Sequence, residues 1–233
     1  MTRYPVIRPI PILYQDEWVA VVHKPAGLLV HPGPEAPDRD TMISRMRRQL
    51  GGYVQPCHRL DRGTSGALLL ALKPEVAPII FKAFQERRVE KRYQAIVRGY
   101  VDQVEMTLDY PLEGRNAISH IRGLEHFCIP FAVSKYPTGR YSLVEIRPHT
   151  GRRHQVRHHL RHLSHPVVGD IKYGDSAHNR FLYQVLGWKR LALASVGISL
   201  VHPVLGRPLV VECPLAWELQ ALTEQMREMS AQC

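Results

Sequence analysis

The sequence predicts an α+β fold. Short apolar segments of strand length outnumber the helical patterns, and they do not alternate with helices in a regular series of βαβ units. The chain has 233 residues, of which 45% are hydrophobic, so it can bury a sizeable core without staples such as disulfides. There is no internal repeat, low-complexity tract or obvious linker, and we therefore expect residues 1–233 to form a single domain.

The expected strands are short apolar runs bounded by turn-forming residues. In chain order they cover residues 12–14, 18–22, 67–71, 93–97, 127–133, 141–146, 195–201 and 208–211. Turn-forming residues at 136–139 and 203–206 join the last four of these strands into two hairpins. The segment Lys24-Pro25-Ala26-Gly27 interrupts the chain after the second strand, and residues 31–38 are expected to form a loop.

The expected helices follow from apolar residues at helical spacing. Asp40 is placed to cap a helix that turns Ile43, Met46 and Leu50 inward. A second helix covers residues 79–88 and ends in basic side chains. The last helix is indicated by apolar residues three and four positions apart: Leu215, Leu219, Leu222, Met226 and Met229.

The charge balance indicates a polyanionic partner. Lys and Arg number 31 and Asp and Glu number 21, which gives a net charge of +10. Such an excess of positive charge suggests nucleic acid, although by itself it is modest support. No stretch approaches the roughly 18 apolar residues of a membrane span, and the first residues lack the apolar core of a signal peptide.

The four cysteines indicate a reducing compartment. They are Cys57, Cys128, Cys213 and Cys233, which are far apart and form no CxxC pair. This spacing does not suggest a disulfide framework. We therefore expect a soluble cytoplasmic protein without membrane contact.

The first candidate site is the segment His58-Arg59-Leu60-Asp61-Arg62-Gly63-Thr64-Ser65-Gly66. The positive charges beside Asp61 favour its ionised form, which suits a nucleophile or a base. Arg59 and Arg62 can also hold phosphates or reach into a duplex. A salt-bridged turn that leads into a strand explains the same pattern equally well.

The second candidate site is the basic segment of residues 150–162. As a helix it would carry Arg153, Arg157 and Arg161 in one stripe and three histidines in another, which indicates an RNA-facing surface. Histidines four residues apart can share a metal ion. We discount a metal here, because Gln155 stands where the HExxH motif needs Glu and several arginines would oppose a divalent cation.

Two weaker segments complete the candidates. In the segment of residues 91–97, Tyr93 follows Lys91 and Arg92, so its ring can stack on a base beside phosphate contacts. A tyrosine in such a strand is more often part of the core. Residues 168–175 form a loop bracketed by glycines, for which the charge pattern alone supports only a turn.

Taken together, these segments resemble the RluA-type pseudouridine synthases over most of residues 12–214. The resemblance rests on five motifs in order: KPxG at Lys24, HRLDxxTSG at His58, KxYxAxVxG at Lys91, TGRxHQ(I/L)R at Thr150, and HPxxGDxxYG at His165. Residues 136–141 and 157–163 are similar to the branch that modifies uridine 65 in the T-stem of tRNA, the TruC branch. Ala194 departs from the family, which often has His at that position.

The resemblance implies the pseudouridine-synthase fold, a long, mixed, mostly antiparallel sheet flanked by helices with a central catalytic cleft. There is no room before Ile12 for the S4 RNA-binding domain that some members carry. The resemblance further implies isomerisation of uridine in RNA without cofactor or metal. The enzyme is expected to be a monomer, and tRNA is favoured over ribosomal RNA as its substrate.

The family's site residues fall on particular positions of this chain. Asp61 is the catalytic carboxylate, as nucleophile or base; Tyr93 stacks on the uracil; and Arg157 pairs with Asp61, in a geometry that can be bidentate. Arg59 fills the place of the flipped nucleotide and Val156 walls the uracil. Phosphate contacts fall to basic residues that include Arg62, Lys91, Arg92 and Arg152.

Two other classes of function fit the same residues less well. An RNA-binding protein without catalysis would leave the set of Asp61, Tyr93 and Arg157 unexplained. A glycoside or nucleoside hydrolase usually needs a second carboxylate. The nearby acids are Asp170 and Asp175, in the loop of residues 168–175, and the fold would have to bring one of them to Asp61.

Overall fold

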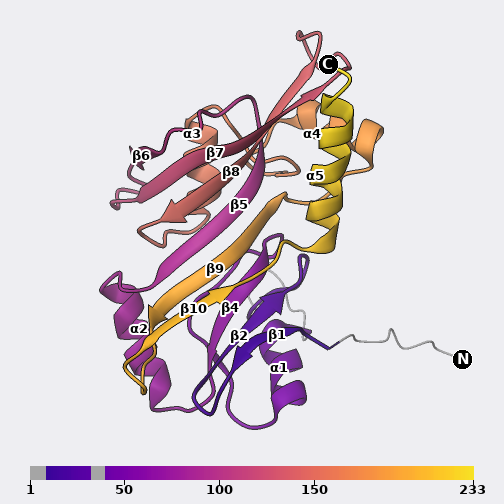
Figure 1. Cartoon of the computed structure of the whole chain (residues 1–233). Coiled ribbons are helices and arrows are strands. Elements are labelled where there is room, and N and C mark those ends of the chain that lie inside the picture. Colours follow the sequence, from indigo (N-terminus) through magenta and orange to yellow (C-terminus); the bar gives the residue numbers. More distant parts are fainter. Residues whose placement is uncertain (1–8, 33–39) are drawn as a thin grey trace, which may run out of the picture.

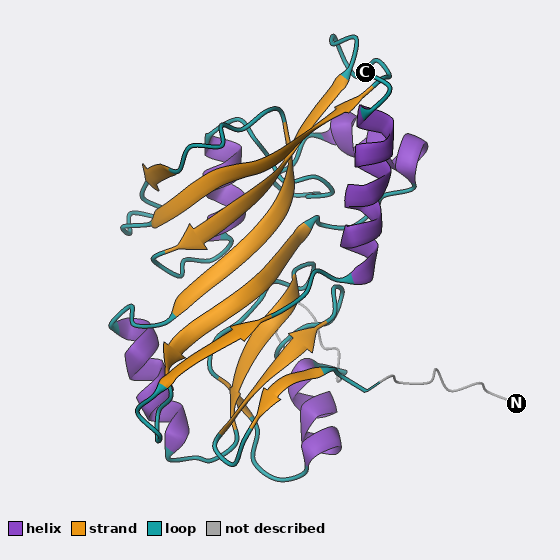
Figure 2. Cartoon of the chain, viewed as in Figure 1, coloured by secondary structure: helices purple, strands orange, loops and turns teal. Residues whose placement is uncertain are grey.

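The computed structural model describes residues 9–32 and 40–233. It confirms the α+β class, with ten strands in one sheet and helices around it (Figures 1 and 2). The strands are β1 (Ile12–Gln15), β2 (Val19–Lys24), β3 (Gln55–Pro56), β4 (Ser65–Ala71), β5 (Glu90–Arg98), β6 (Met106–Asp109), β7 (Ile118–Ile129), β8 (Gly139–Pro148), β9 (Leu193–Val201) and β10 (Pro208–Glu212). The helices are α1 (Met42–Leu50), α2 (Val76–Gln85), α3 (Gln155–His162), α4 (Ser176–Leu186) and α5 (Trp217–Ser230).

The sheet has two parts that meet in its middle. The strand order is β1-β2-β4-β9-β5-β8-β7-β6, with β3 beside β4 and β10 beside β9. Every described pair is antiparallel except β4 with β9. That parallel contact has only two residue pairs, Ser65↔Ala194 and Gly66↔Ser195, which we call the central junction. The long, mixed, mostly antiparallel sheet expected from the resemblance is therefore confirmed.

The central junction requires glycine at one position. Gly66 has a φ of +111°, and a Cβ added there would overlap the backbone of Ser195. Only a residue without a side chain tolerates both the conformation and the close approach. The sequence Thr64-Ser65-Gly66 thus lets the N-terminal strands contact β9 where the charged loop of residues 58–64 enters β4.

The core lies on both faces of the sheet. α2 packs on β4, α3 on β8 and α5 on β7. All seven residues of β4 are buried, which fits a continuous apolar run in the middle of a sheet. Tyr141 and Phe127 are the largest fully buried aromatic residues, on β8 and β7. Among the described residues, no helix is long and apolar enough to cross a membrane.

The cap of the first helix lies one residue later than predicted. Thr41, not Asp40, caps α1: its side chain accepts a hydrogen bond from the Ser44 amide, and the Ser44 hydroxyl accepts one from the Thr41 amide. This reciprocal pair satisfies two amides that a helix start leaves free. Asp40 instead forms an ion pair with Arg45. The buried residues are Met42 and Met46, with Ile43 only half-buried.

Other boundaries moved as well. α2 begins and ends three residues before the predicted helix, and β7 starts at Ile118 and ends at Ile129, four residues before the predicted end. Both predicted hairpins pair antiparallel, as expected. β3, β6 and α4 lacked a recognisable pattern and were not predicted. Most of the loop expected at residues 31–38 lies outside the described residues.

The expectation of unpaired cysteines was wrong. Cys128 at the end of β7 and Cys233 form a disulfide whose Cα atoms are 6.1 Å apart. The contact between α5 and β7 brings the two ends together, and the Ser230 hydroxyl also accepts a hydrogen bond from the Cys128 amide. A separation of 105 residues in sequence hides this proximity. Cys57 and Cys213 are buried free thiols.

Candidate active site

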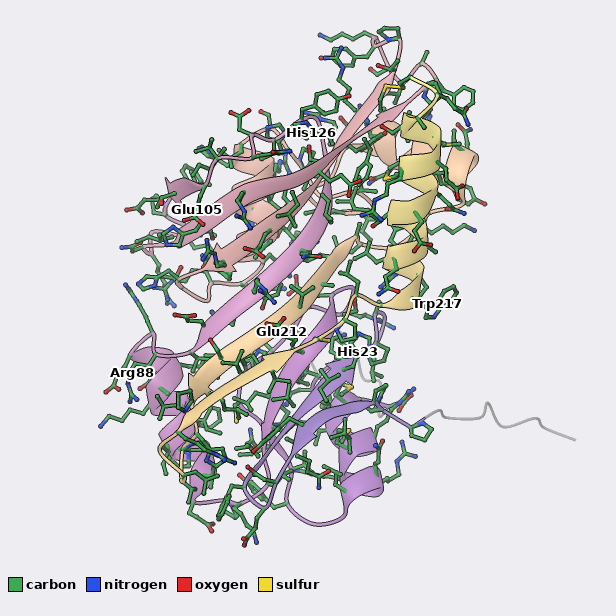
Figure 3. All side chains as sticks on the ribbon, viewed as in Figure 1. His23, Arg88, Glu105, His126, Glu212 and Trp217 are labelled. Atoms are coloured by element: carbon green, nitrogen blue, oxygen red, sulfur yellow. A yellow bond between two sulfur atoms is a disulfide. The ribbon has the colours of Figure 1, made fainter. Side chains whose placement is uncertain are left out.

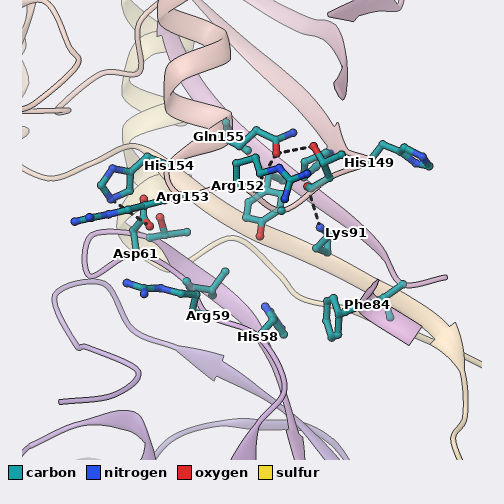
Figure 4. A pocket seen from close by; sticks show the side chains of 18 of the residues that line it. His58, Arg59, Asp61, Phe84, Lys91, His149, Arg152, Arg153, His154 and Gln155 are labelled. Carbon is teal, nitrogen blue, oxygen red and sulfur yellow. Dashed lines mark hydrogen bonds and ion pairs between the residues drawn. The ribbon is translucent and has the colours of Figure 1, made fainter. Parts of the chain in front are cut away.

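A cavity of about 540 Å³ lies where the two parts of the sheet meet (Figure 4). Its wall comes from the loop before β4, the end of α2, β5, and the segment from the end of β8 into α3. Of the predicted site residues, seven line it: Arg59, Asp61, Lys91, Tyr93, Arg152, Val156 and Arg157. The fold therefore brings together residues from three motifs that are far apart in sequence.

A basic side chain lies beside each carboxylate oxygen of Asp61. The Arg157 Nη1 donates a hydrogen bond of 3.0 Å to Oδ2. The His154 Nε2 lies 3.7 Å from Oδ1 and completes an ion pair only when the imidazole is protonated. The Asp61 side chain is 20% exposed, so a ligand in the cavity can reach it. The pairing of Asp61 with Arg157 that the resemblance implied is present.

The bidentate partner of Arg157 is Asp170 rather than Asp61. Arg157 donates from Nε to Asp170 Oδ2 at 2.6 Å and from Nη2 to Oδ1 at 2.8 Å. The Asp170 carboxylate is fully buried and also accepts the backbone amides of Lys172 and Tyr173. One carboxylate thus fixes the guanidinium, which leaves Nη1 for Asp61. The bidentate pairing expected for Asp61 is corrected to a single hydrogen bond.

The charges in this group shift one another's pKa. Burial alone favours neutral Asp170, but the hydrogen bonds from Arg157 and from backbone amides outweigh it and lower the Asp170 pKa. Burial alone also favours neutral Arg157, yet its bonds to Asp170 and Asp61 raise the Arg157 pKa. For His154, burial dominates and lowers the pKa. Asp170 is therefore held as an anion that clamps a permanent cation.

Tyr93 lies in the wall of the cavity. Only 9% of it is exposed, and its hydroxyl interacts with Ser195. Burial and, secondly, the charge of Asp61 raise the Tyr93 pKa, so the phenol is neutral at pH 7. The Val156 side chain is also buried at this wall. The ring and the valine give the cavity the apolar surfaces that a planar base requires.

Lys24 connects the KPxG segment to the loop that carries Asp61. Its fully buried ammonium donates to the carbonyls of Pro25, Leu28 and Arg62, at 2.8, 2.7 and 3.3 Å. Burial lowers the Lys24 pKa to about 7, partly opposed by Asp61. The Gly27 amide also donates a hydrogen bond to the Arg62 backbone carbonyl, and the Gly27 carbonyl accepts one of 3.0 Å from the Arg62 Nε. Arg62 is therefore directed toward Gly27, outside the cavity wall.

The start of α3 differs from the predicted continuous helix. Arg153 and His154 precede the helix, and His154 has a left-handed φ of +55°. The Gln155 side chain orders this bend. Its Oε1 accepts hydrogen bonds from the Thr150 hydroxyl and the Arg152 backbone amide, and its Nε2 donates one to the Ile118 backbone carbonyl. The bend breaks the expected arginine stripe and turns Arg157 toward Asp61 and Asp170.

The predicted cations divide between the cavity and other surfaces. Arg59 is exposed at the rim of the cavity. Arg152 also lines the cavity, and its Nε donates a hydrogen bond to the Asn116 carbonyl. A smaller hollow of about 200 Å³ shares Gly151, Arg152 and Arg153 with the cavity. Arg92 does not line the cavity. It forms an ion pair with Glu212 on β10, which is labelled in Figure 3.

Asp170 and His154 are the site residues that reasoning from charge and spacing missed. The sequence signal for Asp170 was present in the glycine-bracketed loop, but its charge pattern supported only a turn. The position of Asp170 also bears on hydrolysis, since both its oxygens already hold Arg157. It cannot serve as the second acid that a hydrolase usually needs.

Comparisons with known proteins agree with this geometry. The family model described as RNA pseudouridylate synthase matches residues 18–162. The chain is 40% identical to "tRNA pseudouridine synthase C" of Haemophilus influenzae, over 93% of this chain and 97% of that protein. It is also 40% identical to the protein of the same name from Salmonella typhimurium, over 92% and 89% of the two chains.

Solved structures share the architecture. The human "RNA Pseudouridylate Synthase Domain Containing 4" aligns with a TM-score of 0.71 at 25% identity, over 93% of each chain. The human "RNA Pseudouridylate Synthase Domain Containing 1" aligns with a TM-score of 0.70 at 24% identity, which supports the fold alone. With a sheet of this order and an aspartate, a tyrosine and an arginine in one central cavity, the chain belongs to the RNA pseudouridylate synthase family, whose members isomerise uridine in RNA to pseudouridine.

Proposed function

We propose that this chain converts uridine 65 in the T-stem of tRNA to pseudouridine, acting as a monomer in the cytoplasm. The cavity that joins Asp61, Tyr93 and Arg157 carries the proposal for the reaction. The relatives named tRNA pseudouridine synthase C, similar over nearly their whole length, support tRNA as the substrate. The net charge of +10 suits a polyanion of this kind.

The reaction is an isomerisation in which the uracil is detached, turned and joined again. The bond from C1′ of the ribose to N1 of the base breaks, and a bond from C1′ to C5 forms. C5 then loses its proton and N1 gains one, so atoms and electrons balance within the nucleotide. No external group enters, which is why the proposal needs neither cofactor nor metal.

Asp61 acts at the ribose end of the bound nucleotide, either as nucleophile at C1′ or as a base toward the sugar. Arg157 supports this role because its Nη1 aims the carboxylate while Asp170 holds the guanidinium. A group held in one direction needs no reorganisation during the reaction. Lysine is a poor substitute for Arg157, since one ammonium cannot match the planar fork toward two carboxylates.

Tyr93 stacks on the uracil and holds the ring while it turns. Its neutral hydroxyl adds no repulsion beside the anionic Asp61. Val156 covers the base from α3. Both contacts are apolar or nearly so, and they allow the base to rotate between two orientations without breaking directional bonds.

The target uridine must leave its helical stack to reach the cavity, at a cost of a few kcal/mol. We propose that Arg59, exposed at the rim, occupies the vacated place. Arg152 and Arg62 hold neighbouring phosphates. The hollow that Arg152 shares with the cavity offers space for the strand beside the target. Arg92, which pairs with Glu212, is left out of this proposal.

A pseudouridine map of total RNA from source cells with and without the gene tests the substrate. Loss of one T-stem site in tRNA is the expected result. Loss of a ribosomal site instead would keep the reaction and overturn the tRNA substrate. An unchanged map, with no related enzyme acting on the same site, would favour an RNA-binding protein without catalysis.

Asp61→Asn tests the proposed carboxylate. We expect this variant to bind the tRNA with nearly normal affinity and to form no pseudouridine, because an amide cannot supply the negative charge at C1′. Asp40→Asn is the matched control, since Asp40 is exposed and paired with Arg45 far from the cavity. Turnover by purified Asp61→Asn protein would contradict the role of Asp61.

A further inference from the structure

Lys91 lies in the cavity at the end opposite Asp61 (Figure 4). It is two residues before Tyr93 on β5, and both line the cavity wall. Its ammonium donates one hydrogen bond, of 3.3 Å, to the Thr150 carbonyl. No other hydrogen bond or ion pair of Lys91 occurs among the described residues. Two of its three N–H groups therefore have no acceptor in that part of the chain.

A half-buried ammonium without a carboxylate partner costs stability. Burial is the one cause that lowers the Lys91 pKa, to about 8, and no acidic group opposes it. Such a cation is uncommon unless it has a task, because enclosed charges are normally paired. The Thr150 carbonyl takes only one of the three N–H groups of Lys91, which points to a ligand that accepts hydrogen bonds from the others.

The position of Asp61 determines which part of a nucleotide meets Lys91. If Asp61 acts at the ribose, C1′ lies at the Asp61 end of the cavity. The phosphates are bonded to that ribose and stay at the same end, where Figure 4 shows Arg59 and Arg153. The base then extends along Tyr93 toward Lys91. The group that arrives there is the one opposite N1 on the uracil ring, the carbonyl at C4.

We propose that Lys91 is a specificity-determining residue that donates a hydrogen bond to this carbonyl oxygen. The inference rests on the proposed function and deepens it. It differs from the phosphate contact that the sequence suggested for Lys91, because the phosphates lie at the other end of the cavity. A donor-only group accepts uridine and opposes cytidine, whose C4 carries an amino group that is itself a donor.

The same donor also fits the product. In a pyrimidine, N1 lies opposite C4 and C5 lies opposite C2. Turning the uracil about the line through N3 and C6 exchanges N1 with C5 and C4 with C2. The carbonyl opposite the ribose is therefore O4 in uridine and O2 in pseudouridine, at the same point in space. Lys91 can hold the base in both orientations without moving.

Sulfur substitution in the substrate tests the contact, because sulfur accepts hydrogen bonds weakly. Synthetic T-arm hairpins carry uridine, 4-thiouridine or 2-thiouridine at the target position. For the wild-type enzyme we expect 4-thiouridine to lower kcat/KM about tenfold relative to uridine, the loss of roughly one charge-assisted hydrogen bond. For Lys91→Met we expect kcat/KM on uridine to fall about 10- to 100-fold and the 4-thiouridine penalty to vanish.

The controls separate this contact from a structural role. In Asp61→Asn protein, in which the base cannot turn, the loss of binding affinity caused by 2-thiouridine should be the same with and without Lys91→Met, since C2 then faces away from Lys91. Lys73→Met removes an exposed lysine that pairs with Glu17 and should stay within about twofold of wild type. Lys91→Gln keeps one donor and should retain part of the 4-thiouridine penalty, and it serves if Lys91→Met fails to fold.

A full 4-thiouridine penalty in Lys91→Met and Lys91→Gln would overturn the inference, while wild-type activity on the hairpin would leave the proposed function intact. Activity of Asp61→Asn, in contrast, would remove the proposed function itself. The two failures are therefore distinguishable in one set of assays.

Discussion

At the scale of single residues, the cavity depends on charges that hold one another in place. Asp170 has no exposed surface, and its two oxygens fix Arg157, which in turn reaches Asp61 with the remaining nitrogen. Such buried groups contribute little net stability as a set, but removing one member leaves its partners uncompensated. Both oxygens of Asp170 are thus used to orient the Arg157 guanidinium.

Asp170→Asn tests this orientation. We expect the unfolding free energy to fall by about 3–5 kcal/mol, because a buried ion pair loses one partner. We expect kcat to fall by about 10- to 100-fold with KM nearly unchanged, since Arg157 then turns away from its aim at Asp61. The measurements are urea unfolding and steady-state kinetics.

The control is Asp175→Asn, in the same loop. Asp175 caps α4 through the Ala177 and His178 amides and pairs with Arg98. Its loss should cost about 1 kcal/mol and leave kcat unchanged. A normal kcat in Asp170→Asn would show that Arg157 keeps its direction without the clamp.

His58 makes stability depend on pH. Its Nε2 accepts a hydrogen bond from the Leu69 amide, and burial lowers its pKa to about 3. Below about pH 6.5 the unfolded chain binds a proton that the folded chain refuses until about pH 3. Stability is therefore lost as the pH falls through that window and is unaffected by this group above it.

His58→Gln should remove this dependence. Between pH 7 and pH 5 the wild-type protein should lose about 1–2 kcal/mol more unfolding free energy than the variant. His162→Gln, at an exposed histidine that stacks on Tyr110, should behave like wild type. Parallel pH profiles for wild type and His58→Gln, from urea titrations, would disprove the assignment.

Residue chemistry was predictable from the sequence where a motif carried it. Asp61, Tyr93 and Arg157 were identified from the family resemblance, and the pairing of Asp61 with Arg157 is present. The clamp by Asp170 was not foreseen, because charge and spacing describe neighbours along the chain and not the approach of one loop to a distant helix. The same reason explains why Arg92 was grouped with Lys91, although alternate residues of β5 face opposite sides of the sheet.

At the scale of elements, the central junction positions the active site. β4 leaves the charged loop and contacts β9 in two residue pairs, and Tyr93 on β5 pairs with Ser195 on the other side of β9. The strands therefore fix the spacing between Asp61 and Tyr93. The glycine at position 66 makes this contact possible, since any side chain there meets the Ser195 backbone.

Gly66→Ala should break the junction. The overlap is with backbone, which cannot rotate away, so we expect a loss of more than about 3 kcal/mol of unfolding free energy. Gly187→Ala is the matched control, because Gly187 has a left-handed helical conformation with a φ of +68° but nothing within 4 Å of an added Cβ. Its cost should stay at about 1–2 kcal/mol. Thermal melts of both variants measure the difference, and equal melting temperatures would show that a side chain at position 66 does not break the junction.

Elements with a clear apolar pattern were predicted well, and elements without one were not. β1, β2, β4, β5, β9, β10 and α5 lie within a few residues of their expected positions. β3 has two residues, which is too short for a periodic signal, and β6 has only two apolar residues, Met106 and Leu108, which do not form an apolar run. α1 shows a different difficulty: Asp40 and Thr41 are both good capping residues, and the partner at Ser44 decides between them.

At the scale of the whole molecule, the C-terminal helix is fastened to the sheet at several points. α5 packs along β7, Arg227 pairs with Glu125, and the Cys128–Cys233 disulfide closes the end. None of the residues that line the cavity belongs to β7 or α5. The fastening therefore acts on stability and leaves the chemistry to the other elements.

Opening the disulfide should lower stability without changing the rate. For a closed loop of 105 residues, reduction or Cys128→Ser is expected to cost about 2–5 kcal/mol. The kcat should stay within about twofold of the oxidised protein. Unfolding of wild type with and without dithiothreitol measures the effect, and the reductant should leave Cys128→Ser unchanged. A drop in kcat would mean that α5 reaches the active site through the sheet.

The central position of the β4–β9 contact has an evolutionary consequence. β1 and β6 are the outer strands of the described sheet, and the β4–β9 contact lies inside both, separated from β1 by β2 and from β6 by β5, β8 and β7. Insertions or losses at either margin can accumulate without disturbing the spacing of Asp61 and Tyr93. Sequence changes at the margins should therefore be tolerated more readily than changes at this contact, because they leave the central spacing unaltered.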